Sequence, residues 1–226
     1  MNGRVLITGA AGALGRSVVR QFLAAGERVL AVGDHAGGLA ELAAAAPPDA
    51  IEIQKADLTV TAEVDRLFTE APSAVVHTVG GFRWGRIAEM SDDDWSFLLK
   101  VNLDTTFRVF RATARAFTKA GGGSLVAVAA PAGLLGEAGV GAYAATKAGV
   151  LRLVEALARE LAPVGARVNA VLPGTMDTAA NRAAMPGSDP GQWVTTDAVA
   201  SVIHFLTTPA AAGVNGAAVR VPGPTV

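Results

Sequence analysis

The chain opens with the stretch Val5-Leu6-Ile7-Thr8-Gly9-Ala10-Ala11-Gly12-Ala13-Leu14-Gly15, in which an apolar run meets a glycine-rich turn. The apolar run predicts a buried strand, and a helical pattern of apolar residues follows over residues 18–23. Glycines let the backbone approach a pyrophosphate closely, and the first turn of a helix offers free N–H groups. This order predicts a dinucleotide-binding loop, with an ordinary glycine-rich turn as the alternative.

Strand and helix patterns alternate along the rest of the chain. This alternation predicts an α/β fold with a doubly wound parallel sheet of about seven strands and helices on both faces. We expect one domain over residues 1–226, with a cofactor half at about 1–120 and a catalytic and lid half at about 121–226. The expected strands are residues 5–7, 28–32, 51–56, 74–78, 125–129, 167–172 and 217–221, and the later helices are residues 39–46, 60–68, 91–120, 140–161 and 197–206.

One long segment, residues 175–193, shows no regular pattern. A loop of this length in a compact domain is usually functional and often forms a lid over a site. We therefore expect it to be an irregular substrate lid.

Composition excludes several classes of protein. The 19 basic and 20 acidic residues nearly balance, so bulk charge predicts neither a nucleic-acid nor a membrane partner. The chain has no cysteine, and its histidines at 35, 77 and 204 stand apart; we expect no disulfide, thiolate nucleophile or metal site. With no charged leader and no apolar run long enough to span a bilayer, we expect a cytoplasmic protein acting on a small molecule.

Tyr143, the only tyrosine, lies four residues before Lys147 within a predicted helix. This spacing places both side chains on one face. A lysine ammonium beside a phenol favours the phenolate and lowers the phenol pKa, as a general acid/base near neutral pH requires. The pair is therefore a candidate catalytic pair, although an ordinary surface helix gives the same spacing.

Three other positions are candidate site residues. Asn102 lies inside a predicted helix, where asparagine is unfavourable without a special reason. Asp34 follows the second strand, where a carboxylate accepts from the ribose hydroxyls and repels a 2′-phosphate, unless it only forms a turn. No Arg or Lys follows it, which favours NAD(H) and leaves NADP(H) possible. The aromatic and basic loop at residues 82–86 follows a glycine turn and is either a substrate wall or rim packing.

Together these motifs resemble the short-chain dehydrogenase/reductase family over nearly the whole chain. The resemblance implies a Rossmann fold, an NAD(P)-dependent oxidoreductase activity, and catalytic roles for Tyr143, Lys147 and Asn102. It identifies Arg167-Val168-Asn169-Ala170-Val171-Leu172-Pro173-Gly174 as the strand whose end passes the nicotinamide. The predicted cofactor-binding residues, besides Tyr143 and Lys147, are Gly9, Ala11, Gly12, Ala13, Leu14, Gly15, Asp34, Asp57, Leu58, Val79, Gly80, Gly81, Pro173, Gly174, Thr175 and Thr178.

Two departures from the family pattern matter. Ala13 replaces a common loop glycine, and Ala130 stands thirteen residues before Tyr143, where the family has its catalytic serine. A donor of that kind is worth about 2.7–4 kcal/mol of transition-state stabilisation. A plain ketone reductase should therefore suffer without it.

Dihydropteridine reductases resemble the chain in lacking this serine, in the loop from Gly9 to Gly15, in the aromatic residues after Gly80-Gly81, and in the lid. That likeness implies a planar, quinonoid dihydropterin-like substrate. Asn102 and Gly33 fit this subgroup less well. A general carbonyl reductase or alcohol dehydrogenase, and a non-catalytic nucleotide sensor or scaffold, stay open. The predicted substrate-binding residues are Phe82, Trp84, Ala130, Met185 and Trp193.

The helices expected around residues 93–119 and 140–161 carry long apolar faces. In the resembling family these helices pair between subunits, which implies a homodimer or homotetramer.

Overall fold

Strand β1 (Arg4–Thr8) is buried along its whole length and lies inside a parallel sheet of seven strands. The computed structural model describes residues 3–47 and 49–224. The strand order is β3-β2-β1-β4-β5-β6-β9, and every neighbouring pair is parallel. The predicted doubly wound sheet is confirmed. The other strands are β2 (Arg28–Gly33), β3 (Ile51–Lys55), β4 (Ala74–His77), β5 (Gly123–Val128), β6 (Ala166–Pro173) and β9 (Ala218–Val221).

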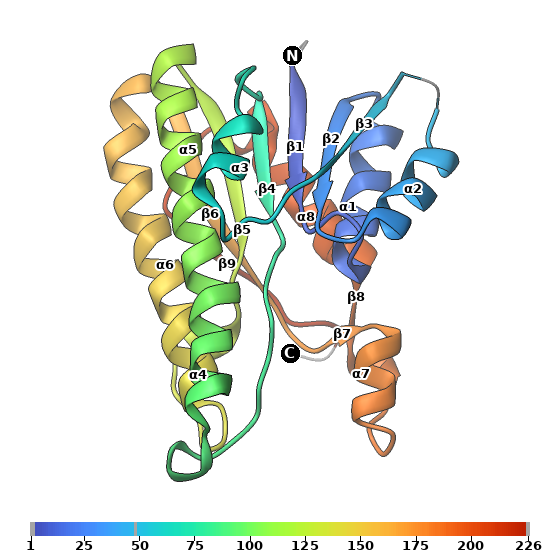
Figure 1. Ribbon diagram of the computed structural model, residues 1–226, viewed down its shortest axis with the longest axis vertical. Helices are drawn as coiled ribbons and strands as arrows, with labels where there is room; N and C mark the ends of the chain where they lie inside the picture. Colours follow the sequence, from blue (N-terminus) through green and yellow to red (C-terminus); the bar gives the residue numbers. More distant parts are fainter. Residues whose placement is uncertain (1–2, 48, 225–226) are drawn as a thin grey trace.

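Helices cover both faces of the sheet (Figure 1). Because successive side chains on a strand point to opposite faces, Val5 and Ile7 join one core cluster whereas Leu6 joins the other. The first cluster is built with α1 (Ala13–Ala24), α2 (Ala36–Ala45) and α8 (Thr196–Thr207). The second cluster is built with α3 (Thr61–Arg66), α5 (Thr105–Ala120) and α6 (Gly141–Leu161).

The order of the sheet reverses direction between β1 and β4. The chain moves outward from β1 to β2 and β3, then returns to β4 on the other side of β1. Ligands of such sheets bind outside the carboxyl ends of the strands at this switch point. The turns that follow Thr8 and His77 therefore frame the expected site.

The helix predicted over residues 91–120 is not a single α-helix. It consists of α4 (Asp92–Leu98), a π-helical turn η2 (Leu99–Asp104) and α5. Single π-helical turns inside α-helices are often found at functional sites. Asn102 lies within this turn, and the sequence pattern gave no sign of it.

The predicted irregular lid is wrong in detail, because residues 175–193 are partly ordered as secondary structure. Met176–Asp177 (β7) pairs in parallel with Val194–Thr195 (β8), and α7 (Ala179–Ala184) lies between them. Figure 1 shows α7 standing away from the main sheet. The ordering is local, since the Thr178 hydroxyl accepts from the amide of Asn181 at the start of α7.

Short 3-10 turns complete the described part of the chain. Two of them flank α6, and another closes the lid segment. The turns are η1 (Ile87–Glu89), η3 (Pro131–Gly133), η4 (Ala162–Val164), η5 (Pro190–Gln192) and η6 (Pro209–Ala211).

Gly15 provides a test of how tightly the glycine loop packs against α1. A Cβ on Gly15 would lie 2.1 Å from the carbonyl oxygen of Gly9, whereas one on Gly12 would lie 3.3 Å from the same atom. We expect Gly15→Ala to lower the free energy of unfolding by about 1–3 kcal/mol through overpacking. Equilibrium urea denaturation measures this loss, and Gly12→Ala is the matched control. Equal stability of the two variants would contradict the described loop packing.

Candidate active site

Tyr143 and Lys147 lie in the first two turns of α6, facing the carboxyl end of the sheet. The Lys147 side chain is buried, and its Nζ donates to the carbonyl oxygen of Val128 over 3.1 Å. The same Nζ lies 5.8 Å from the centre of the Tyr143 ring. The predicted pair is therefore brought together at the end of β5.

Burial shifts the pKa values of both members of the pair. It raises the pKa of Tyr143 to about 12, since a buried phenolate loses hydration. It lowers the pKa of Lys147 to about 8 for the corresponding reason. The expectation that Lys147 brings the Tyr143 pKa below its ordinary value is therefore wrong for this arrangement, because burial of the phenol raises its pKa.

Asn102 has a clear reason to lie inside a helix. Its Oδ1 accepts from the backbone amide of Gly81 and its Nδ2 donates to the carbonyl oxygen of Gly81, each over 2.9 Å. Nδ2 also donates to the Thr146 hydroxyl, which donates in turn to the carbonyl oxygen of Tyr143. The side chain thus joins the glycine turn after β4 to the helix that carries the catalytic pair.

Gly80 marks the point where these groups meet. A Cβ on Gly80 would lie 3.0 Å from Asn102 Oδ1 and 3.0 Å from Lys147 Nζ. A side chain at this position would press on both polar atoms and move at least one of them by a few tenths of an ångström. Glycine at this position therefore leaves both atoms undisturbed.

The aromatic loop borders this site. The Phe82 ring packs edge-on against Tyr143 with ring centres 5.0 Å apart. Trp84 is 67% exposed and covers Gly139, whose Cβ would lie 2.5 Å from the indole nitrogen. Phe82 therefore lies directly beside the proposed proton donor, whereas Trp84 lies further out along the rim. Ala130 is buried at the start of η3 and offers no hydroxyl.

The glycine loop has the features that a phosphate group needs. Gly9 takes a positive φ of 70°, and a Cβ there would lie 2.6 Å from the Thr78 hydroxyl oxygen. Gly12 caps α1 without any side-chain acceptor, so the N–H groups of the first turn are available to an anion. Leu14 and Gly15 anchor the loop in the core.

A cavity of about 620 Å³ lies beside this loop. Asp57 is held at its edge, where its Oδ1 accepts from both the amide and the hydroxyl of Thr59; these hydrogen bonds lower the pKa of the carboxyl group. The cavity brings together most of the predicted adenosine-side residues, namely Gly9, Asp34, Asp57, Leu58 and Val79.

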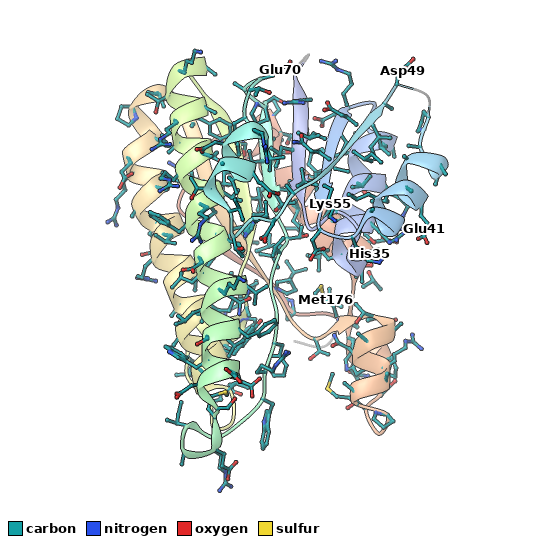
Figure 2. The ribbon with its side chains drawn as sticks, viewed as in Figure 1. His35, Glu41, Asp49, Lys55, Glu70 and Met176 are labelled. Carbon is teal, nitrogen blue, oxygen red and sulfur yellow. The ribbon has the colours of Figure 1, made fainter. Side chains whose placement is uncertain are left out.

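Lys55 also lines this cavity and was missed by the sequence reasoning. It is the register partner of Gly33 in the adjacent strand, and Figure 2 shows it at the same end of the sheet as His35. Among the described residues its ammonium group has no partner in a hydrogen bond or ion pair. The only sign of this role was that Lys55 ends β3, the strand that pairs with β2, and that Asp34 directly follows β2.

The lid residues occupy different surroundings. Gly174 donates to the carbonyl oxygen of Val221, which fixes the Pro173-Gly174-Thr175 turn beside β9. Met185 is partly exposed after α7. Trp193 is buried and lines a second cavity with Arg220 and Pro222. None of the predicted catalytic residues lines that cavity, so a substrate contact for Trp193 stays a prediction.

In residues 3–47 and 49–224, no group of three or more His, Cys, Asp and Glu side chains is placed to hold a metal ion. Within the same ranges, no helix has the length and apolar character needed to cross a membrane.

The glycine loop, the switch point and the Tyr–Lys pair define a dinucleotide-dependent oxidoreductase. Comparison with known proteins agrees: a family model described as short chain dehydrogenase matches residues 3–188. The chain belongs to the short-chain dehydrogenase/reductase family, whose members bind NAD(P), and it is an NAD(P)-dependent oxidoreductase.

Relatives and solved structures support this membership. A 3-oxoacyl-(acyl-carrier-protein) reductase FabG of Pseudomonas aeruginosa is 31% identical over 99% of this chain and 97% of its own. A (3R)-3-hydroxyacyl-CoA dehydrogenase of Mus musculus is 35% identical over 71% of this chain and 66% of its own. A crystal structure of a family oxidoreductase from Burkholderia thailandensis, 31% identical, superposes with a TM-score of 0.90, covering 99% of this chain and 92% of that one.

The pKa of Lys147 predicts the pH dependence of substrate reduction. Tyr143 stays protonated up to about pH 12, whereas the buried ammonium of Lys147 loses its proton at about pH 8. Its positive charge stabilises the phenolate that forms as the proton leaves, so we expect the reduction rate to be highest below pH 8 and to fall above it.

A pH–rate profile under saturating cofactor measures this fall. Lys147→Arg is the control, because a guanidinium group keeps its charge throughout the range. The arginine variant should lose the inflection near pH 8 even if its overall rate is lower. An unchanged inflection would assign the titration to another group.

Proposed function

We propose that the chain reduces a small substrate with NAD(P)H, using Tyr143 as the proton donor and Lys147 and Asn102 as its supporting groups. The observation that carries the proposal is that Lys147 Nζ and Asn102 Oδ1 both lie beside Gly80. Tyr143 precedes Lys147 by one turn on the same helix. The same arrangement would be unnecessary in a non-catalytic scaffold, since burying an ammonium group costs stability.

The residues present fit the cofactor. The N–H groups after Gly12 would hold the pyrophosphate, Asp57 and Leu58 would border the adenine, and Pro173, Gly174, Thr175 and Thr178 would border the nicotinamide. When bound, the reduced nicotinamide supplies a hydride to the substrate.

The cofactor preference depends on two opposed charges. Asp34 would accept from the ribose hydroxyls and repel a 2′-phosphate, which favours NAD(H). Lys55 lines the same cavity and would attract a 2′-phosphate. We propose NAD(H) as the preferred cofactor, with Lys55 allowing NADP(H) to bind.

The protein's own groups complete the chemistry. The Tyr143 hydroxyl gives its proton to the substrate atom that becomes negative as it is reduced. Lys147 stabilises the phenolate that remains, and it would also donate to the nicotinamide ribose. We further propose that Asn102 holds a relay water behind Lys147. This water would pass on the proton that restores the Tyr143 hydroxyl.

Ala130 points to the class of substrate. Because no hydroxyl stands at this position, a simple carbonyl oxygen lacks a hydrogen bond worth about 2.7–4 kcal/mol in the transition state. A conjugated, electron-poor substrate such as a quinonoid dihydropterin needs less help of this kind. Phe82 supplies aromatic surface beside Tyr143 for a flat ring, and the exposed Trp84 would extend that surface at the rim.

The relatives favour a second candidate, a 3-oxoacyl thioester. Two of them are named for acyl-carrier-protein or acyl-CoA substrates. The half-exposed Phe82, which packs against Tyr143, would then border an acyl chain. Such an enzyme would need another donor in place of the serine.

We also propose a homodimer or homotetramer acting in the cytoplasm. Phe107 on α5 and Trp95 on α4 are partly exposed apolar side chains on the long outer helices. Covering them with a second copy would remove apolar surface from water.

Turnover tests the proposal directly. We expect Tyr143→Phe to lower kcat at least about 100-fold, the lower end for loss of a general acid, while the dissociation constant for NADH stays within about twofold. Absorbance at 340 nm follows turnover, and fluorescence titration follows cofactor binding. Full activity of Tyr143→Phe would contradict the assignment.

A substrate panel distinguishes the classes. Quinonoid dihydropterin, quinones, simple ketones and a 3-oxoacyl thioester are each assayed with NADH and with NADPH. Ala130→Ser is the matched variant: it should raise ketone turnover and leave pterin turnover little changed. Turnover of the thioester alone would select the second candidate, and cofactor binding without any turnover would contradict both.

A further inference from the structure

We infer that His77 is a positioning residue that ties the glycine loop to the backbone of Asn102, with one ring nitrogen serving each partner. The inference rests on the proposed function, because it concerns the same site. His77 is the last residue of β4, directly before the turn that carries Gly80 and Gly81.

The ring of His77 bridges two elements on opposite sides of it. Nδ1 lies 2.8 Å from the hydroxyl of Thr8, the residue before Gly9 in the loop. Nε2 lies 3.1 Å from the hydroxyl of Thr106 on α5. All three side chains are buried, so water cannot replace either contact without opening the core.

The hydrogen bonds define which ring nitrogen carries the proton. The Thr106 hydroxyl donates its single hydrogen to the carbonyl oxygen of Asn102 over 2.6 Å. Nε2 must therefore carry a hydrogen and donate to Thr106. Nδ1 of the neutral ring then accepts from Thr8. Nε2 is thus the donor to Thr106, and Nδ1 is the acceptor from Thr8. The two nitrogens cannot exchange these roles.

The contacts continue beyond Asn102 to the catalytic helix. The Asn102 side chain holds Gly81 and reaches Thr146, whose hydroxyl donates to the carbonyl oxygen of Tyr143. The contacts therefore run from Thr8 through His77 and Thr106 to the backbone of Asn102, and from the Asn102 side chain through Thr146 to the backbone of Tyr143. The Thr8 carbonyl oxygen, in turn, accepts from the Thr78 hydroxyl beside Gly9.

His77 stays neutral throughout the working pH range. Burial, reinforced by the positive charge of Lys147, lowers the pKa of His77 to about 3. The ring therefore stays uncharged and keeps its hydrogen bonds with Thr8 and Thr106. It does not act as a pH-dependent switch.

Two amide variants separate the two contacts. The side-chain amide of asparagine reaches the position of Nδ1, and that of glutamine reaches the position of Nε2. His77→Asn should keep the bond with Thr8 and lose the bond with Thr106. His77→Gln should do the reverse. Each leaves one buried hydroxyl with a lost partner, so both should lose similar stability.

The functional effects should differ between the variants. We expect His77→Asn to bind NADH within about twofold of the unmodified chain but to lose about 5- to 100-fold in kcat, as an unsatisfied buried group would cause. We expect His77→Gln to keep kcat within about threefold and to bind NADH about 5-fold or more weakly, for the same physical reason.

Hydrogen exchange supplies a readout that needs no substrate. The Gly81 amide, which donates to Asn102 Oδ1, should exchange faster in His77→Asn and stay protected in His77→Gln. Equal changes in kcat, NADH binding and exchange in both variants would overturn the inference and leave His77 a core residue. If the unmodified chain turned over no substrate, the proposed function would fail, whereas the exchange and binding results would still decide the role of His77.

Discussion

The pair of hydrogen bonds between the Asn102 amide and the backbone of Gly81 holds the active site together. Gly81 belongs to the turn after β4, and Asn102 belongs to the π-helical turn between α4 and α5. Because an asparagine amide satisfies both a donor and an acceptor of one residue, it fixes that turn in position and orientation. Gly80 is then placed against Lys147 Nζ without a side chain to obstruct it.

The parallel sheet explains why these groups meet at all. Parallel strands end at one edge, and the order reverses between β1 and β4, so the glycine loop, the Gly80-Gly81 turn and the end of β5 lie together. Figure 2 shows Lys55 and His35 at this end of the sheet, and Met176 below them, where the chain leads to α7. The fold thus brings the loops of the site close together, and individual buried hydrogen bonds fix the orientation of their residues.

The sheet, the glycine loop and the Tyr143–Lys147 pair could be predicted from the sequence, because each depends on local periodicity or fixed spacing. The π-helical turn could not, since it depends on hydrogen bonds with distant Gly81. Lys55 was missed because its nearness to Asp34 follows from strand register. The pKa of Tyr143 was predicted in the wrong direction, because spacing reveals a neighbouring charge but not the depth of burial. The helix α7 was missed because its pattern is only six residues long.

We propose that this site transfers a hydride directly to a substrate that Tyr143 protonates without a hydroxyl at position 130. Single-turnover oxidation of NADH and of NADH dideuterated at C4, each followed by the loss of NADH absorbance, tests this proposal most directly. We expect a slower reaction with the deuterated cofactor, because a C4–D bond must break as the hydride leaves, whichever substrate atom receives it. Equal single-turnover rates with the two cofactors would contradict hydride transfer as the reaction of this site.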